Sequence, residues 1–143
     1  MTAQAITSAT DHVLAEVRNQ VGHLTLNRPG GLNAINFEMV RSLQQQLDAW
    51  VEDPQVKAVV LRGAGEKAFC AGGDIRSLYD SYQNNDTLHT LFFEEEYALA
   101  LTLHRYPKPV VALMDGFVLG GGMGLVQGAD LRLVTERSKL AMP

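Results

Sequence analysis

The chain has 143 residues, of which 46% are hydrophobic and 20% are charged, and its formal net charge at pH 7 is −4. This length suits one globular domain with its own core, and the mildly acidic composition without a basic patch argues against nucleic acid as a partner. No apolar run is long enough to cross a membrane, and the single cysteine, Cys70, is typical of a reducing compartment, so we expect a cytoplasmic location.

The N-terminal third predicts a flexible terminus, a hairpin and a helix. Residues 1–10 are small and polar without the basic start of a signal peptide, and one domain is expected over residues 11–143. Apolar and polar residues alternate over Val13–Val17 and Val21–Leu26, which predicts a β-hairpin with one buried face. The glycines and the proline of residues 27–31 end the second strand.

A helix is predicted from Asn36, as the N-cap, to about Glu52. Apolar residues recur in it at steps of three and four and form one stripe: Met39, Val40, Leu43, Leu47 and Trp50. Asp53-Pro54 ends the helix, and Val56–Leu61 is expected to form a short buried strand.

A first glycine junction follows that strand. Residues 67–75 run through Gly72 and Gly73 into a predicted helix over Ile75–Tyr82, with Asp74 at the N-cap position. The polar residues 81–86 are expected to form a loop.

A longer helix is predicted from Thr87, as its cap, to about Arg105. Phe92, Leu99 and Leu103 share one face of this helix, and Glu96 lies on it between them. A carboxylate within an apolar stripe is costly unless it has a partner or a function, although a place at the edge of the stripe would let it reach water.

A second glycine junction lies in Val110–Gly124. A buried strand reaches a turn at Asp115-Gly116, then Gly120, Gly121 and Gly122, and a short helix over Met123–Gly128. A helix that begins at glycines has unpaired and accessible N–H groups in its first turn, and these suit a phosphate or a developing oxyanion. Tight packing alone would also explain the glycines.

Two strand–glycine–helix junctions in one small domain could direct two backbone N–H groups at one point, as an oxyanion hole requires. Beyond them, the sequence predicts a strand over Leu131–Thr135, a turn at residues 136–138 and the start of a further element at residues 139–142.

Four motifs in this order resemble the crotonase (enoyl-CoA hydratase/isomerase) superfamily. They are Asn27-Arg28-Pro29 with Gly31-Leu32-Asn33-Ala34, then residues 68–75 (Ala-Phe-Cys-Ala-Gly-Gly-Asp-Ile), then residues 107–112 (Pro-Lys-Pro-Val-Val-Ala), and Gly120-Gly121-Gly122. The resemblance implies an α/β fold in which repeated β-β-α units form a spiral core. It also implies an acyl-CoA substrate, with coenzyme A as part of the substrate and no permanently bound cofactor.

The resemblance also assigns residues. The N–H groups of Gly73 and Gly121 would be the oxyanion donors, and Gly121 and Glu96 would contact the substrate. The coenzyme would lie against the residues that match the family's binding loop: Leu32, Ala71, Gly72, Gly73, Asp74 and Ile75. Arg28 is expected to be a solvated loop charge rather than a coenzyme contact.

Two departures from the family pattern bear on the reaction. Gly124 stands where hydratases of the family carry a catalytic Glu, which favours the branch that hydrolyses short hydroxyacyl-CoA thioesters. In that branch the main catalytic Glu follows directly after a run matching Ala141-Met142-Pro143, so we expect this chain to be the N-terminal part of a longer enzyme, ending before the C-terminal helical part. An isomerase, a hydratase, a non-catalytic acyl-CoA-binding fragment, a homo-oligomer and association with a C-terminal part remain open alternatives.

Other chemistries lack their signatures in this sequence. Cys70 has no nearby His and is expected to be a small buried residue rather than a nucleophile. There is no Gly-x-Gly-x-x-Gly, no phosphate loop, no Gly-x-Ser-x-Gly elbow and no His/Cys/Asp grouping with the spacing of metal ligands.

Overall fold

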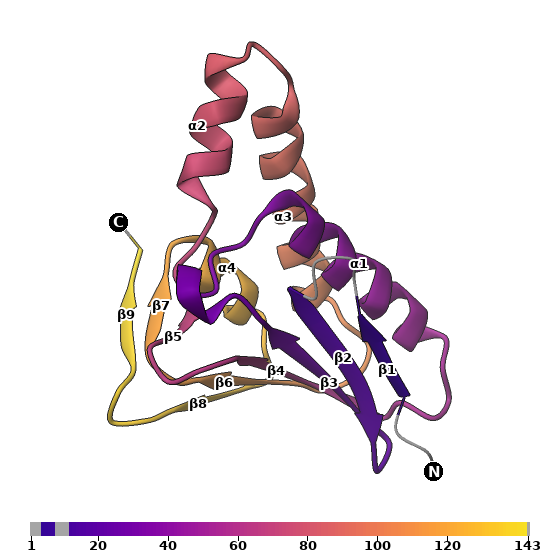
Figure 1. Ribbon diagram of the computed structural model, residues 1–143. Helices are drawn as coiled ribbons and strands as arrows, with labels where there is room; N and C mark the ends of the chain where they lie inside the picture. Colours follow the sequence, from indigo (N-terminus) through magenta and orange to yellow (C-terminus); the bar gives the residue numbers. More distant parts are fainter. Residues whose placement is uncertain (1–3, 8–11, 143) are drawn as a thin grey trace.

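The computed structural model describes residues 4–7 and 12–142, which form two sheets with helices on one side of the larger sheet (Figure 1). The larger sheet has the strand order β1-β2-β3-β4-β6-β8, and the smaller one has the order β5-β7-β9. The strands are β1 (Gln4–Thr7), β2 (Val13–Arg18), β3 (Val21–Leu26), β4 (Ala58–Gly63), β5 (Ala68–Cys70), β6 (Val110–Met114), β7 (Phe117–Leu119), β8 (Leu131–Val134) and β9 (Lys139–Ala141). The helices are the 3-10 turn η1 (Pro29–Gly31), α1 (Phe37–Val51), α2 (Ile75–Gln83), α3 (Leu88–His104) and α4 (Gly121–Val126).

The chain passes three times from the larger sheet to the smaller one. The strands β4, β6 and β8 are parallel neighbours in the larger sheet, and β5, β7 and β9, which follow each of them, are parallel neighbours in the smaller sheet. The helices α2 and α3 connect the first pair of strands to the second, and α4 connects the second to the third. This repetition confirms the predicted α/β spiral of β-β-α units.

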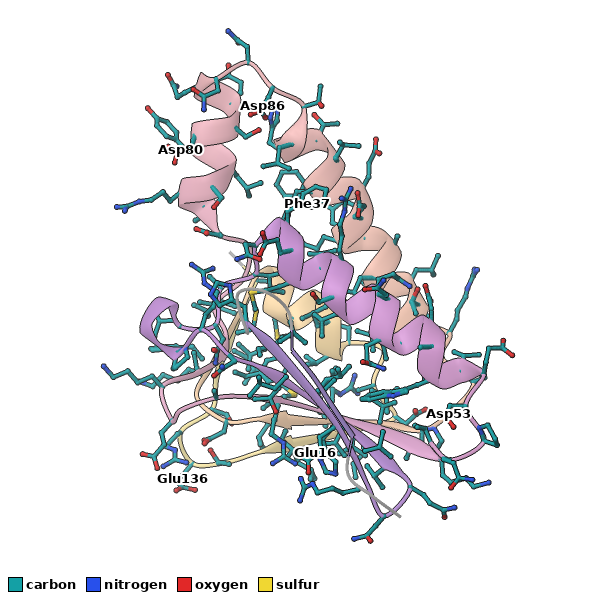
Figure 2. All side chains as sticks on the ribbon, turned by 45° about the vertical axis from the view of Figure 1, so that its right-hand side comes forward. Glu16, Phe37, Asp53, Asp80, Asp86 and Glu136 are labelled. Carbon is teal, nitrogen blue, oxygen red and sulfur yellow. The ribbon has the colours of Figure 1, made fainter. Side chains whose placement is uncertain are left out.

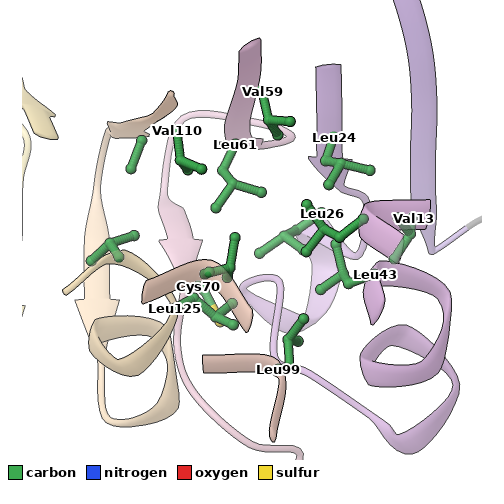
Figure 3. Close-up of a cluster of buried hydrophobic side chains, with 14 of the residues drawn as sticks. Val13, Leu24, Leu26, Leu43, Val59, Leu61, Cys70, Leu99, Val110 and Leu125 are labelled. Carbon is green, nitrogen blue, oxygen red and sulfur yellow. The ribbon is translucent and has the colours of Figure 1, made fainter. Parts of the chain in front are cut away.

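The core lies between the larger sheet and the helices. Strands β2 and β3 pair antiparallel, with Val13 opposite Leu26, and alternate residues of both strands are buried as the sequence pattern predicts. Helix α1 begins as predicted, because the Oδ1 atom of Asn36 accepts a hydrogen bond of 2.9 Å from the N–H of Met39. Figure 3 shows that the cluster continues past Leu43 and Leu99 to Leu125.

Helix α2 and the first turns of α3 form a hairpin that stands away from the sheets, whereas Leu99 and Leu103 of α3 belong to the core (Figure 1). Figure 2 shows Asp80 and Asp86 at the far end of the hairpin. Thr87 occupies the predicted N-cap position of α3, but its side chain makes no cap bond. Instead, the Oδ1 atom of Asp86 accepts from the N–H of Leu88, and the hydroxyl of Ser81 accepts from the N–H of His89. No helix of the described residues is long and apolar enough to span a membrane.

Several predicted boundaries were wrong. Four residues of the expected flexible terminus, Gln4–Thr7, form β1 and pair antiparallel with β2, while the other residues of 1–10 lie outside the described part. The strand expected at Val56–Leu61 begins at Ala58, because the N–H of Val56 donates to Asp53 in the turn after α1 and that of Lys57 donates to Gln20 between β2 and β3. Helix α4 begins two residues earlier than expected, because the glycines themselves form its first turn.

Candidate active site

The two glycine junctions meet because the short strands that precede them are neighbours. Strands β5 and β7 pair in parallel, with Ala68 opposite Phe117 and Cys70 opposite Val118. Parallel strands end at the same edge of their sheet, so the glycines after β5 and those after β7 lie side by side. A Cβ atom added at Gly72 would lie 3.4 Å from the amide nitrogen of Gly121, and Gly72 has a φ of +101°, so a side chain here would be strained as well as crowded.

The N–H of Gly73 points toward the second junction. Ile35 forms a parallel bridge with Gly73, in which the N–H of Ile35 donates to the carbonyl of Gly72 (2.7 Å) and the N–H of Asp74 donates to the carbonyl of Ile35 (2.8 Å). In a parallel bridge of this kind, the residue between the two bonded groups, here Gly73, directs its own N–H away from the partner segment that carries Ile35. The nitrogen of Gly73 is 3.7 Å from the place that a Cβ of Gly121 would occupy, and its N–H donates to no acceptor among the described residues.

Gly121 supplies the second free amide, since it is the first residue of α4 and its N–H has no partner within the helix. The preceding Gly120 has a φ of +52°, and its N–H donates to the carbonyl of Ala141 (3.0 Å). Within residues 4–7 and 12–142, the N–H of Gly121 makes no hydrogen bond.

The carboxyl group of Glu96 lies against the same point. Glu96 is only 8% exposed and shares the buried face of α3 with Phe92, Leu99 and Leu103, as the helical spacing predicts. A Cβ atom at Gly121 would collide with its Oε1 atom. The carboxyl group makes no hydrogen bond or ion pair to the described residues, and burial raises the pKa of Glu96 above its ordinary value. The unpaired N–H groups of Gly73 and Gly121 and the buried carboxyl group of Glu96 therefore lie around one point.

The residues predicted to border a coenzyme form one strip beside these amides. The carbonyl of Leu32 accepts a hydrogen bond of 3.0 Å from the N–H of Ala71, which joins the 28–34 loop to the first glycine junction. Asp74 and Ile75 begin α2 at the other end of the strip, where Ile75 is 78% exposed. The structure thus brings these residues together in one strip, which runs from the buried Gly72 to the exposed Ile75.

Arg28 is not the solvated charge that we expected. Its guanidinium donates to the carbonyl of Ala34 (2.8 Å) and forms an ion pair of 3.5 Å with Asp74, and the side chains of Arg28 and Asp74 are only 23% and 19% exposed. The Asp74 carboxylate also accepts from the hydroxyl of Ser77 (2.8 Å), although it makes no direct cap bond to α2. The sequence could not predict the ion pair, because Arg28 and Asp74 are 46 residues apart along the chain.

Asn33 is a residue that the sequence analysis did not single out. It is fully buried with a φ of +55°, a left-handed conformation that Asn tolerates better than most residues. Its position in a Gly- and Asn-rich turn was the only available sign of this conformation.

Cys70 is a buried structural residue, as predicted. Its side chain has no solvent exposure, and desolvation by burial raises the pKa of its thiol to about 12. The N–H of Gly72 donates to its Sγ atom (3.4 Å). A nucleophilic cysteine needs an accessible thiolate, which this environment disfavours. The described part of the chain also contains no group of three or more His, Cys, Asp or Glu residues that could hold a metal ion.

The spiral and its paired glycine amides define an α/β protein of the crotonase type. The enoyl-CoA hydratase/isomerase family model matches residues 21–143, and the chain belongs to this family.

Curated relatives include the mitochondrial 3-hydroxyisobutyryl-CoA hydrolases of Danio rerio and Homo sapiens. The first is 44% identical over 135 residues, which cover 94% of this chain and 35% of the relative. The second is 42% identical over 137 residues, which cover 96% of this chain and 36% of the relative. The chain therefore spans about a third of the length of these relatives.

Solved structures with the same fold include a carnitinyl-CoA dehydratase from Mycobacterium thermoresistibile, with a TM-score of 0.89 and 44% identity, covering 92% of this chain and 39% of that one. An enoyl-CoA hydratase from Rhodobacter sphaeroides 2.4.1 has a TM-score of 0.88 and 40% identity, covering 92% of this chain and 40% of that one.

Proposed function

We propose that this chain is the oxyanion-holding part of an enzyme that hydrolyses a short hydroxyacyl-CoA thioester, 3-hydroxyisobutyryl-CoA, to 3-hydroxyisobutyrate and coenzyme A. The convergence of the Gly73 and Gly121 amides on the Glu96 carboxyl group carries the proposal. The relatives named above support the choice of substrate. Coenzyme A enters as part of the substrate, and the proposal requires no permanently bound cofactor.

The chemistry follows from where charge develops. Water adds to the thioester carbonyl, the carbonyl oxygen becomes negative, and the C–S bond then breaks as the leaving sulfur takes a proton. Two fixed N–H donors stabilise that oxygen without having to reorganise, and the loss of one such donor typically costs about 100-fold to 1000-fold in rate. In this proposal Glu96 orients the substrate hydroxyl or the attacking water. The principal acid/base group comes from the part of the relatives' length that this chain does not span.

Gly124 supports hydrolysis over hydration of a double bond. A Cβ atom at Gly124 would meet nothing within 4 Å, so there is room for an acidic side chain where the sequence provides none. Hydration of an enoyl thioester requires an acid and a base to act on the two carbons, whereas thioester hydrolysis does not use an acid at this position. An isomerase remains the competing assignment.

The test is release of free thiol from 3-hydroxyisobutyryl-CoA, measured for this chain and for the same chain extended along its natural reading frame. We expect release by the extended chain and little or none by residues 1–143 alone. A shifted or hydrated acyl-CoA product without free thiol would instead support an isomerase or a hydratase. Binding of the thioester without any turnover by either chain would indicate an acyl-CoA-binding protein.

A further inference from the structure

The loop of residues 28–35 holds both flanks of the first glycine junction. On one flank, the Nδ2 atom of Asn33 donates to the carbonyl oxygens of Ala64 (3.0 Å) and Ala68 (2.8 Å), at the two ends of the turn between β4 and β5. The Oδ1 atom of Asn33 accepts from the N–H of Arg28 (2.8 Å), so the same side chain also closes its own loop. The buried side-chain amide of Asn33 thus satisfies three backbone groups, two carbonyls and one N–H.

On the other flank, the same loop pairs with the backbone of the junction. Ile35 bridges Gly72 and Asp74, and the Arg28 guanidinium ties the carbonyl of Ala34 to the Asp74 carboxylate. The segment that carries Gly73 is therefore fixed at Ala68 before it and at Asp74 after it.

Residues 71–73 cannot fix their own orientation by side-chain packing. They are Ala-Gly-Gly, and the N–H of Gly73 makes no hydrogen bond within the described chain. Glycine also has the greatest backbone freedom of any residue. The direction of the Gly73 N–H must therefore be imposed from outside the segment, and the contacts above impose it.

We propose that Asn33 is a positioning residue, which aims the Gly73 N–H at the developing oxyanion by clamping the β4–β5 turn to the 28–35 loop. This inference rests on the proposed function for its effect on rate, but its effect on the Gly73 amide is independent of any activity. Misplacement of a catalytic group by about 1 Å can cost on the order of 100-fold in rate.

The test compares a variant at Asn33 with a control variant in another part of the chain. Asn33→Gly removes the clamp but keeps a residue that tolerates the left-handed backbone. Lys108→Met is the control, because Lys108 donates to the carbonyls of Trp50 and Asp53 at the far end of α1 and touches no part of the junction. Urea unfolding measures the stability of each variant. Asn33→Asp, which keeps the Oδ1 acceptor for the N–H of Arg28 but loses the Nδ2 donor to Ala64 and Ala68, is the second clamp variant in case Asn33→Gly does not fold.

Two readouts separate positioning from stability. In the ¹H–¹⁵N spectrum of the chain, Asn33→Gly should shift or broaden the Gly73 amide signal, and Lys108→Met should leave that signal in place. In the extended chain, Asn33→Gly should lower kcat for thiol release at least tenfold with less than a threefold change in KM, and Lys108→Met should leave kcat within twofold.

An unchanged Gly73 signal in both clamp variants would overturn the inference, as would an equal loss of kcat in the Lys108→Met control. If the unsubstituted extended chain releases no thiol, the proposed function fails. The amide spectrum then still decides whether Asn33 orients Gly73.

Discussion

Glu96 is an acidic side chain buried without a partner in the described structure. It is 8% exposed and lies beside Gly121 on the apolar face of α3. Burial disfavours the charged form, so the pKa of Glu96 is raised above its ordinary value of 4.5. The folded chain therefore retains a proton on Glu96 at pH values where the unfolded chain has lost it.

This difference gives a pH-dependent prediction for Glu96→Gln. Because the folded state binds the extra proton, the free energy of unfolding contributed by Glu96 falls as the pH rises from below 4.5 through the raised pKa. Between pH 4.5 and the raised pKa, we expect the free energy of unfolding of the wild type to fall relative to that of Glu96→Gln. Below pH 4.5, the difference between the two proteins should stay constant. Urea unfolding of both proteins from pH 3.5 to pH 7.5 measures the difference. A difference that does not change with pH would mean that Glu96 titrates normally and is not desolvated.

Single residues were predictable where the local pattern contained the cause. Helical spacing placed Glu96 on the face of Phe92 and Leu99 but left open whether it reaches water, and the resemblance, not the stripe, pointed to a substrate contact. The structure shows that the side chain is buried. The burial of Arg28 was missed, because its partner Asp74 is 46 residues away along the chain. Asn33 was missed for the same reason, since the carbonyls that it binds belong to a turn more than 30 residues later.

At the scale of elements, the glycine junctions were visible but the strands before them were not. Glycine after an apolar run is a strong local signal that a strand has ended, so both junctions were placed correctly. Strands β5 and β7 have only three residues each, which is too few for an alternating pattern to be recognised. Their parallel pairing, which brings Gly73 and Gly121 together, is a property of the spiral and not of either segment.

Alanine should affect two glycines of α4 differently, one through activity and the other through stability. At Gly121 a Cβ would collide with the Glu96 carboxyl group, whereas at Gly124 it would meet open space. We expect Gly124→Ala to stabilise the chain by about 0.5–1 kcal/mol, the usual gain for alanine over glycine inside a helix. We expect Gly121→Ala to displace the Glu96 carboxyl group with little loss of stability and, in the extended chain, to lower the kcat of thiol release by about 10-fold to 100-fold.

Thermal unfolding and the thiol assay on both variants test this pair of predictions. Gly124→Ala also serves as the control for α4, because it adds the same methyl group to the same helix. Equal kcat values for the two variants would show that the crowding between Gly121 and Glu96 has no bearing on the site.

At the scale of the whole molecule, each of the two sheets has an exposed edge strand near the C-terminal end of the chain. All residues of β8 and β9 are exposed. Among the described residues, β8 is the edge strand of the larger sheet. The exposed side chains include Leu131 (51%), Leu133 (44%) and Val134 (62%). A strand edge presents unpaired N–H and C=O groups, and although β8 carries one charged residue, Arg132, its three exposed apolar side chains favour pairing with another chain.

We therefore expect the isolated chain to associate as its concentration rises, through β8. Leu133→Lys places a charge on this edge strand and should shift the association to concentrations at least tenfold higher, as measured by sedimentation velocity. The matched control is Leu91→Lys on α3, where a leucine of similar exposure (40%) lies away from any strand edge. If both substitutions reduce association equally, general charge repulsion and not the edge of β8 is responsible. If neither does, the chain associates through another surface, for which the exposed aromatic residues of α2 and α3 would be the next to test.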